Sequence, residues 1–237
     1  MDIIRPIEID IYNIRNERQK INNELAMKRI QERILNKDIN NEEYKRILLE
    51  LSKFNKTEND LLNECNDNII SLIILAGRIS INASRQGTKD ELLQIDTCNI
   101  TCNKFGISMD KLSVNAYRPT KNGLILNNID IKKNKISLND CLKSFDAKLN
   151  GKINGWVFAK IVIGNGGHQD NVFEEAYNLC EWIIKYSLIS DLYIILIDTD
   201  LTTKFNDLKK KFSNNENLII GNHIEIQQYF IDKYNHD

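Results

Sequence analysis

Apolar and charged residues follow two different patterns along the chain, and the pattern changes near residue 90. From Ile11 to about Ser84, apolar residues recur at helical spacing among charged ones, and no proline or glycine lies between Pro6 and Gly77. Asparagine-rich stretches predict two breaks in this helical region. The helices expected after the first break are Glu42–Lys53 and Asp60–Ile81.

The segment Ile69–Leu75, within the last of these helices, is apolar around most of its circumference. A helix that is apolar on all sides is typical of a buried position. We therefore expect this segment to be buried, and we expect residues 1–90 to form a helical N-terminal region.

Beyond Gly87, short β-rich or mixed pieces alternate with asparagine, glycine and proline. These pieces are Leu92–Ile100, Leu112–Ala116 and Leu124–Ile131. Two longer runs, Leu142–Leu149 and Trp156–Ile163, flank a turn that contains Gly151 and Gly155. This arrangement predicts a β-hairpin.

The rest of the chain alternates between helical and strand patterns. A helix is expected from Asn171 to about Tyr186, and the continuous apolar run Leu192–Ile197 is typical of a strand covered on both faces. The elements expected after it are a helix over Lys204–Phe212, a strand over Asn217–Ile220 and a helix over Glu225–Tyr234. Strand, helix and strand in this order predict an α/β core over residues 91–237, with a mixed, partly parallel sheet flanked by helices.

Composition narrows the possible environments of the protein. The 237 residues carry a formal net charge of −1, so any contact with nucleic acid would need a local basic patch. The five cysteines are irregularly spaced, and no second pair or histidine accompanies Cys98 and Cys102 at zinc-site spacing. No apolar run is long enough to span a bilayer, and the first residues have no signal-peptide pattern. We expect a reduced, soluble, cytoplasmic (intracellular) protein without a membrane partner.

Lys160 stands where an apolar strand ends, and burial of an ammonium group is costly unless it meets an anion or a carboxylate. Asp146 lies fourteen residues earlier, on the other arm of the predicted hairpin. A hairpin would bring the two side chains together. Such a pair can hold Mg²⁺ against a phosphate and orient a water molecule. In an isolated hairpin, a plain cross-strand salt bridge is the favoured interpretation.

A glycine-rich corner, Gly164 to Gly167, follows the strand. It does not match a phosphate-binding P-loop, because no Gly-Lys-Ser/Thr follows it, and it lacks the glycine spacing of a dinucleotide-binding loop. We therefore expect no nucleotide cofactor. Asp170 and Asn171 are typical of residues that cap a helix.

The order of these features over residues 143–200 resembles the type II restriction endonucleases of the PD-(D/E)XK superfamily: strand, aspartate, turn, strand ending in lysine, glycine corner, helix and buried strand. The pattern of residues 201–237 is compatible with the resemblance. It implies a restriction-endonuclease-like fold and a Mg²⁺-dependent, sequence-specific endonuclease of double-stranded DNA that leaves 5′-phosphates. It also implies a homodimer, for which residues 1–90 are the expected interface.

In this resemblance Asp146 is the first metal-binding acid and Lys160 is the lysine that positions the attacking water. The sequence departs from the family at Phe158, because the family has an acid two residues before the lysine. We expect Glu174, on the following helix, or Glu91, on an earlier helix, to supply the second carboxylate, with Asp170 a poorer choice. A second register, with Asp130 as first acid and Asp146-Ala147-Lys148 as the D-x-K element, leaves Lys160 without a role.

Polar side chains near the predicted site could contact DNA, since arginine and glutamine read base edges and smaller polar groups contact phosphates. The candidates are Ser84, Arg85, Gln86, Arg118, His168, Gln169 and Asn171. The first three are equally compatible with the polar end of a helix before a turn at Gly87.

Two alternative functions remain open at this stage. Phe158, in place of an acid, would suit a DNA-binding protein of the same fold that has lost catalysis. A repair or viral nuclease of this fold that recognises DNA structure rather than sequence is the other alternative.

Overall fold

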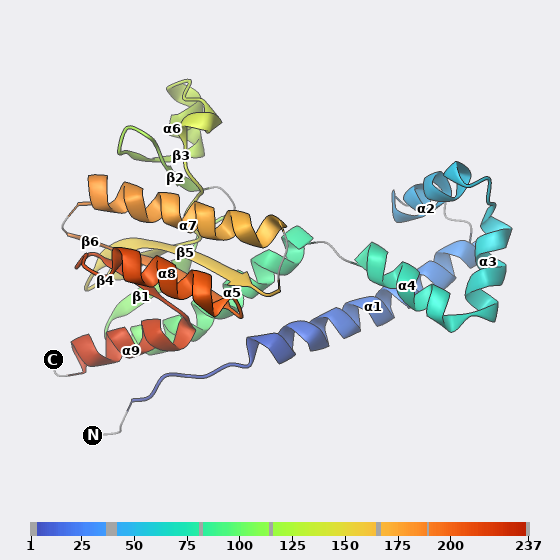
Figure 1. The fold of residues 1–237 in the computed structure, drawn as a ribbon, viewed down its shortest axis with the longest axis horizontal. Coiled ribbons are helices and arrows are strands. Elements are labelled where there is room, and N and C mark those ends of the chain that lie inside the picture. The colour runs from blue at the N-terminus through green and yellow to red at the C-terminus, as the bar shows by residue number, and fades with distance from the viewer. Residues whose placement is uncertain are drawn as a thin grey trace. The chain divides into compact units, whose positions relative to one another are not determined.

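The computed structural model describes the backbone of residues 4–36, 42–80, 83–113, 116–164, 167–188 and 190–235. Within these ranges the side chains of residues 29–36, 42–44, 62, 66, 77–80, 83–87 and 167–170 are not described. The chain forms two compact units, shown as ribbons in Figure 1. One comprises residues 10–86. The other comprises residues 1–9 together with residues 87–237.

The unit of residues 10–86 is helical. Its helices are α1 (Ile11–Asn36), α2 (Glu42–Lys53), α3 (Glu58–Asp67) and α4 (Ile69–Ser80). Thr57 caps α3 in a reciprocal capping box with Asp60. Asn68 has an extended backbone, with φ −137° and ψ 97°, and separates α3 from α4. The expectation of one helix over Asp60–Ile81 was therefore wrong.

The expectation that Ile69–Leu75 is buried is also wrong for most of that segment. Leu72 and Ala76 are fully buried against α1 and α3, but four isoleucines on the other side of α4 are about half exposed. These are Ile69, Ile70, Ile73 and Ile74. The neighbouring helices cover only one side of α4, so an apolar face is left open to solvent.

The larger unit is a mixed α/β structure with a five-stranded sheet flanked by helices, which confirms the expected fold class at that level. The strand order is β1-β4-β5-β6-β7. Strands β1, β4 and β5 are antiparallel neighbours, and β5, β6 and β7 are parallel neighbours. The strands are β1 (Ile107–Lys111), β4 (Ala147–Gly151), β5 (Asn154–Val162), β6 (Asp191–Thr199) and β7 (Leu218–Gly221).

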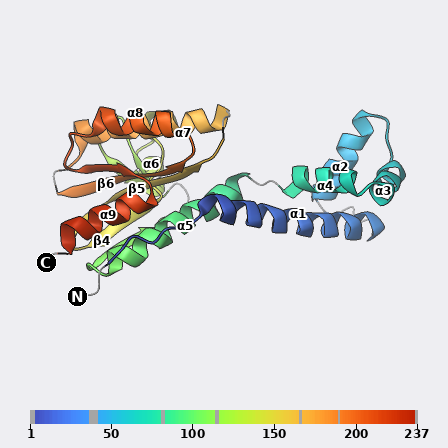
Figure 2. The same cartoon turned by 60° about the horizontal axis from the view of Figure 1, so that its bottom comes forward.

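Helices cover both faces of this sheet, as Figure 2 shows. Helices α5 (Ala83–Asn103) and α9 (His223–Tyr234) pack on one face, and α7 (Gly167–Tyr186) and α8 (Thr202–Phe212) pack on the other. Strand β6 alternates between the two cores: Ile194 faces α5 and α9, and Ile195 faces α7 and α8. Both faces are apolar, so the continuous hydrophobic run predicted this strand correctly.

A small insert lies between β1 and β4. It contains the two-stranded sheet of β2 (Tyr117–Pro119) and β3 (Ile125–Asn127), the short helix α6 (Asn128–Lys133) and the 3₁₀ turn η1 (Leu138–Asp140). Figure 1 shows it beside α7. The predicted piece Leu124–Ile131 is therefore part strand and part helix.

The prediction of β-rich structure over Leu92–Ile100 is wrong, because these residues belong to α5. The alternative interpretation of Ser84, Arg85 and Gln86 as the end of a helix before a turn at Gly87 is wrong for the same reason, since α5 runs through Gly87. Among the helices in the described ranges, none is both long and apolar enough to cross a membrane. All five cysteines are unpaired, and Cys98 and Cys102 are buried core residues of α5.

Candidate active site

The β4–β5 hairpin places Asp146 beside Lys160, as the sequence predicted. Ala147 pairs with Val157 in the antiparallel register, and the Asp146 N–H donates to the Val157 carbonyl at 2.7 Å. The Asp146 carboxylate therefore lies along β5, where Oδ2 accepts hydrogen bonds from the Ala159 N–H at 2.9 Å and from Lys160 Nζ at 3.0 Å. The backbone bond fixes the carboxylate independently of the lysine.

Helix α5 brings a second carboxylate to the same ammonium group. Lys160 Nζ donates to Glu91 Oε1, and Lys111 Nζ of β1 donates to the other oxygen, Oε2, at 2.9 Å. The side chains of Asp146, Lys160, Glu91 and Lys111 are between 13% and 21% exposed. Two carboxylates and two ammonium groups, from α5, β1, β5 and the residue before β4, thus form one nearly buried cluster.

Burial and charge act in opposite directions on the two central groups of this cluster. Burial raises the pKa of Asp146 above its ordinary value, and the repulsion from Glu91 adds to it, although Lys160 and the Ala159 N–H act against the rise. Burial alone would lower the pKa of Lys160, but the carboxylates of Asp146 and Glu91 outweigh it, so the pKa of Lys160 is raised. Lys160 is therefore held in its charged form, while the charge on Asp146 is only partly compensated.

The cluster offers oxygen ligands to a divalent cation. Mg²⁺ in proteins is usually held by one or two carboxylates, with water molecules and substrate phosphates as the other ligands. Asp146 and Glu91 fit this requirement. Among the side chains that the structure describes, no group of three or more His, Cys, Asp or Glu residues is placed to hold a metal ion.

Phe158 is the position at which the resemblance expects an acid, and its side chain belongs to the core. It is fully buried among residues of α7 and α8, and its ring lies 5.0 Å from Lys160 Nζ. An apolar ring is required here because this side of β5 is covered by helices. The second carboxylate of the cluster comes from Glu91 on α5 instead.

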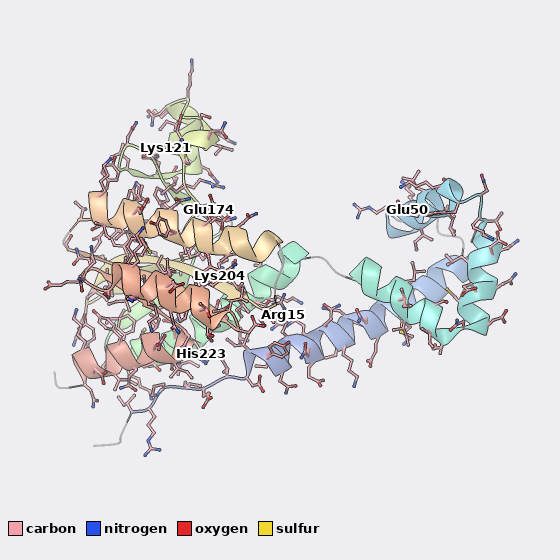
Figure 3. The ribbon with its side chains drawn as sticks, in the orientation of Figure 1. Arg15, Glu50, Lys121, Glu174, Lys204 and His223 are labelled. Atoms are coloured by element: carbon pink, nitrogen blue, oxygen red, sulfur yellow. The ribbon has the colours of Figure 1, made fainter. Side chains whose placement is uncertain are left out.

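Glu174 lies on α7, where its side chain is exposed (Figure 3). Within the described residues it has no hydrogen bond or ion pair with Asp146 or Lys160; its neighbour Glu175 pairs with Lys143 at 3.1 Å. The side chain of Asp170 lies outside the described part of the structure. In the second register, Asp130 lies in α6 of the insert and Lys148 Nζ lies over the Trp156 ring at 5.6 Å; no described hydrogen bond or ion pair joins the two side chains.

Of the seven candidates for DNA contact, only Arg118 and Asn171 have side chains that the structure describes. Ser84, Arg85 and Gln86 lie in the first turn of α5, and His168 and Gln169 lie in the first turn of α7, but the side chains of all five are outside the described residues. Asn171 is exposed in the same turn of α7. Arg118 is half-buried in the insert and donates from Nη1 to the Leu142 carbonyl at 3.2 Å, which gives it a structural contact.

A buried polar network next to the cluster was not predicted. The Gln94 side-chain amide donates to the Lys160 carbonyl at 3.2 Å and to Asp198 Oδ2 at 2.5 Å. Asp198 Oδ1 lies 2.6 Å from His223 Nδ1, at the start of α9 (Figure 3). His223 Nε2 accepts from the Ile9 N–H at 3.2 Å, so Nδ1 carries the proton that Asp198 accepts.

The same network holds the N-terminal segment against α9. Gln227 accepts from the Ile7 N–H and donates to the Ile7 carbonyl, both at 2.9 Å, and Thr101 donates to Gln227 at 2.7 Å. These contacts explain why residues 1–9 belong to the larger unit. The sequence signals were present: an aspartate, Asp198, directly after the continuous apolar run Leu192–Ile197, and the polar residues of α5 at helical spacing.

Comparisons with known proteins identify no relative of this chain. No family model matches it, no curated protein matches it, and no solved structure matches it.

Proposed function

We propose that the protein is a Mg²⁺-dependent endonuclease of double-stranded DNA, of the type II restriction-endonuclease kind. The observation that supports this most strongly is the convergence of Asp146 and Glu91 on Lys160, at one end of the β4–β5 hairpin. A nearly buried carboxylate pair can hold a divalent ion against a phosphate, and a charged lysine beside it can orient the attacking water.

Each residue of the cluster has a distinct role in this proposal. Asp146 and Glu91 would hold the ion, which when bound supplies positive charge against the developing charge on the phosphate. Lys160, fixed between the two carboxylates, orients the water molecule for attack in line with the leaving oxygen. Lys111 holds Glu91 through the oxygen that Lys160 does not use.

The arrangement of the elements also supports a restriction-endonuclease-like fold. The hairpin that carries Asp146 and Lys160 is followed by α7 and by the parallel strand β6, in the order on which the sequence resemblance depends. The sheet is mixed, with the antiparallel hairpin joined to parallel strands. Sequence specificity and 5′-phosphate products belong to this proposal because the same resemblance implies them.

Digestion of plasmid DNA tests the proposed function. Wild-type protein with Mg²⁺ is expected to linearise or fragment plasmid, and the fragments should have the same discrete ends in every digest if cleavage is sequence-specific. Ends at scattered positions would favour the structure-selective nuclease. Plasmid that stays supercoiled, while the protein still shifts duplex DNA in a gel, would favour the inactive DNA-binding protein, for which Phe158 is the supporting observation.

The exposed isoleucines of α4 support a homodimer. Large exposed apolar patches are characteristic of interaction surfaces, and residues 69–77 contain no charged residue. A second copy of the chain would supply a second cluster for the other DNA strand, because the described residues of one chain form a single cluster of Asp146, Glu91 and Lys160. A symmetric contact between two α4 faces would bury the same isoleucines on both sides.

Replacement of one of these isoleucines by a charged residue should separate the dimer. Ile73→Glu is expected to shift the mass measured by light scattering from that of two chains to that of one, because an unpaired charge at an apolar contact is costly. Leu49→Glu, at an exposed apolar residue of α2, makes the same kind of change away from the α4 isoleucines and should leave the mass unchanged. A wild-type protein that is monomeric at micromolar concentration would contradict this part of the proposal.

A further inference from the structure

The insert of residues 117–143 is strongly basic, although the chain as a whole is not. It contains six lysine or arginine residues and two aspartates, which gives a formal charge of +4, whereas the whole chain has −1. The remaining 210 residues therefore carry 26 basic and 31 acidic side chains. All residues of the insert are described in the structure.

Three of these six basic residues form ion pairs or a hydrogen bond within the protein. Lys121, on the turn of the insert (Figure 3), lies 3.7 Å from Asp140; Lys143 pairs with Glu175; and Arg118 donates to a backbone carbonyl. The other three are the exposed Lys132, Lys133 and Lys135, for which the described residues provide no ion pair. These three lysines are called the lysine tip below.

A structural role explains only part of this charge. Lysine in the last turn of a helix interacts favourably with the helix dipole, by about 0.3–1 kcal/mol, and Lys132 and Lys133 lie in the last turn of α6. Lys135 lies beyond the helix, so the dipole does not account for it. Two lysines of α8 provide a contrast, since Lys209 pairs with Glu225 and Lys211 lies 3.8 Å from Glu181.

The base of the insert is fixed directly beside the candidate active site. The Leu142 N–H donates to the Pro119 carbonyl at 2.8 Å, and the Phe145 N–H donates to the Tyr117 carbonyl at 3.0 Å. Trp182 of α7 donates to the Thr120 carbonyl at 2.7 Å. The residue after Phe145 is Asp146, so the chain passes from the insert straight into the catalytic cluster.

We infer that the insert binds the phosphate backbone of the duplex and holds it while Asp146 acts on a nearby phosphate. The inference rests on the proposed function, and it assigns the substrate contact to a part of the chain outside the cluster. Duplex DNA carries one negative charge per about 1.7 Å of its axis, so a duplex that reaches Asp146 presents many further phosphates to the adjacent basic surface. Phosphate contacts of this kind fix the position of the DNA and do not read its sequence.

A protein partner is the competing occupant of the insert. Leu124, Ile129 and Leu138 are each more than half exposed there, and apolar groups of this kind are common at protein interfaces. Leu124 lies in the turn before β3, Ile129 in α6 and Leu138 in η1, and charged or polar residues lie between them in the sequence. The net charge of +4 therefore favours a polyanion.

The experiment measures binding of a fluorescent duplex of mixed sequence by anisotropy, with Ca²⁺ in place of Mg²⁺ so that the DNA stays intact. The test variant is Lys132→Glu/Lys133→Glu. The matched control is Lys104→Glu/Lys152→Glu, which changes net charge equally at two exposed lysines by the far end of the hairpin. Lys132→Gln/Lys133→Gln removes the contacts without placing acids at the end of α6, and circular dichroism checks that each variant is folded.

The test variant is expected to bind roughly tenfold or more weakly at about 0.1 M salt, and the glutamine variant should reduce the slope of log affinity against log salt by about two. The control should keep the wild-type slope. Equal losses in test and control, or no loss in either, would overturn the inference, as would failure of the wild type to bind duplex at low salt. If the wild type binds through the lysine tip but does not cleave with Mg²⁺, the proposed catalysis fails and the binding surface stands.

Discussion

Asp146→Asn is expected to reduce the rate of Mg²⁺-dependent DNA cleavage by about a thousandfold or more, with little change in the affinity for DNA. Several kilocalories per mole of transition-state stabilisation depend on a correctly held metal ion, and each 1.4 kcal/mol is a factor of ten in rate. Asparagine keeps the oxygen that accepts from the Ala159 N–H but loses the negative charge. Single-turnover cleavage of a labelled duplex measures the rate, and anisotropy measures the affinity.

Asp191→Asn is the matched control for this substitution. Asp191 is a partly exposed aspartate at the start of β6, at the end of the strands opposite to Lys160. The same chemical change there should leave both rate and affinity unchanged. Cleavage by Asp146→Asn at the wild-type rate would show that the nuclease activity, if any, does not use this cluster.

Lys160→Met is expected to abolish cleavage and also to destabilise the fold at neutral pH by about 3 kcal/mol or more, because two nearly buried carboxylates lose their shared cation. Chemical denaturation at pH 7.5 and at pH 5 measures the loss. Lys152→Met, in the exposed turn of the hairpin, should cost almost nothing at either pH.

The pH dependence of this loss has a definite sign. In the wild type, Lys160 lowers the pKa of Asp146 against the larger effect of burial. Removal of the lysine leaves burial and Glu91, and both raise the pKa of Asp146, so ionisation of Asp146 costs more folding free energy. That cost is present above the folded-state pKa and disappears as the pH falls and Asp146 binds a proton. The destabilisation should therefore be smaller at pH 5 than at pH 7.5.

A double variant separates charge from packing. Lys160→Met/Asp146→Asn should recover much of the stability lost at pH 7.5, because the uncompensated charge on Asp146 is gone, and it should remain inactive. If the double variant were as unstable as the single one, the loss would come from packing of the lysine stem, and the electrostatic account of the cluster would be wrong.

The sequence predicted the α/β core well where burial is purely apolar. Strand β6 and helices α7 and α8 were predicted within a few residues, because their buried positions are occupied by apolar residues at strand or helix spacing. Helix α5 was missed because its buried face is largely polar: Asp90, Gln94, Thr97 and Thr101 are all buried. A hydrophobic pattern cannot reveal a helix that buries polar side chains in a hydrogen-bonded network.

The candidate site was predictable only where local geometry determines it. Asp146 and Lys160 are joined by one hairpin, so their meeting follows from the register of two adjacent strands. Glu91 was named as one of two candidates, but only the fold shows that it reaches Lys160. The network of Gln94, Asp198 and His223 joins residues 25 to 104 positions apart, and no local pattern encodes such pairings.

In the helical unit, the sequence predicted more burial than the structure shows. Its apolar pattern predicted a buried segment over Ile69–Leu75, but the neighbouring helices α1 and α3 cover only one side of α4. A sequence pattern records that a surface is apolar and does not record whether the same chain covers it.

Anomalous diffraction from crystals grown with Mn²⁺ tests the central claim most directly, since Mn²⁺ takes the same oxygen ligands as Mg²⁺. The account predicts an anomalous peak at bonding distance, about 2.2 Å, from a carboxylate oxygen of Asp146, with Glu91 in the same site, and no such peak in Asp146→Asn. A wild-type crystal in which Mn²⁺ binds elsewhere, while Lys160 still joins Asp146 to Glu91, would contradict it: the cluster would then be a buried salt bridge and not a metal site.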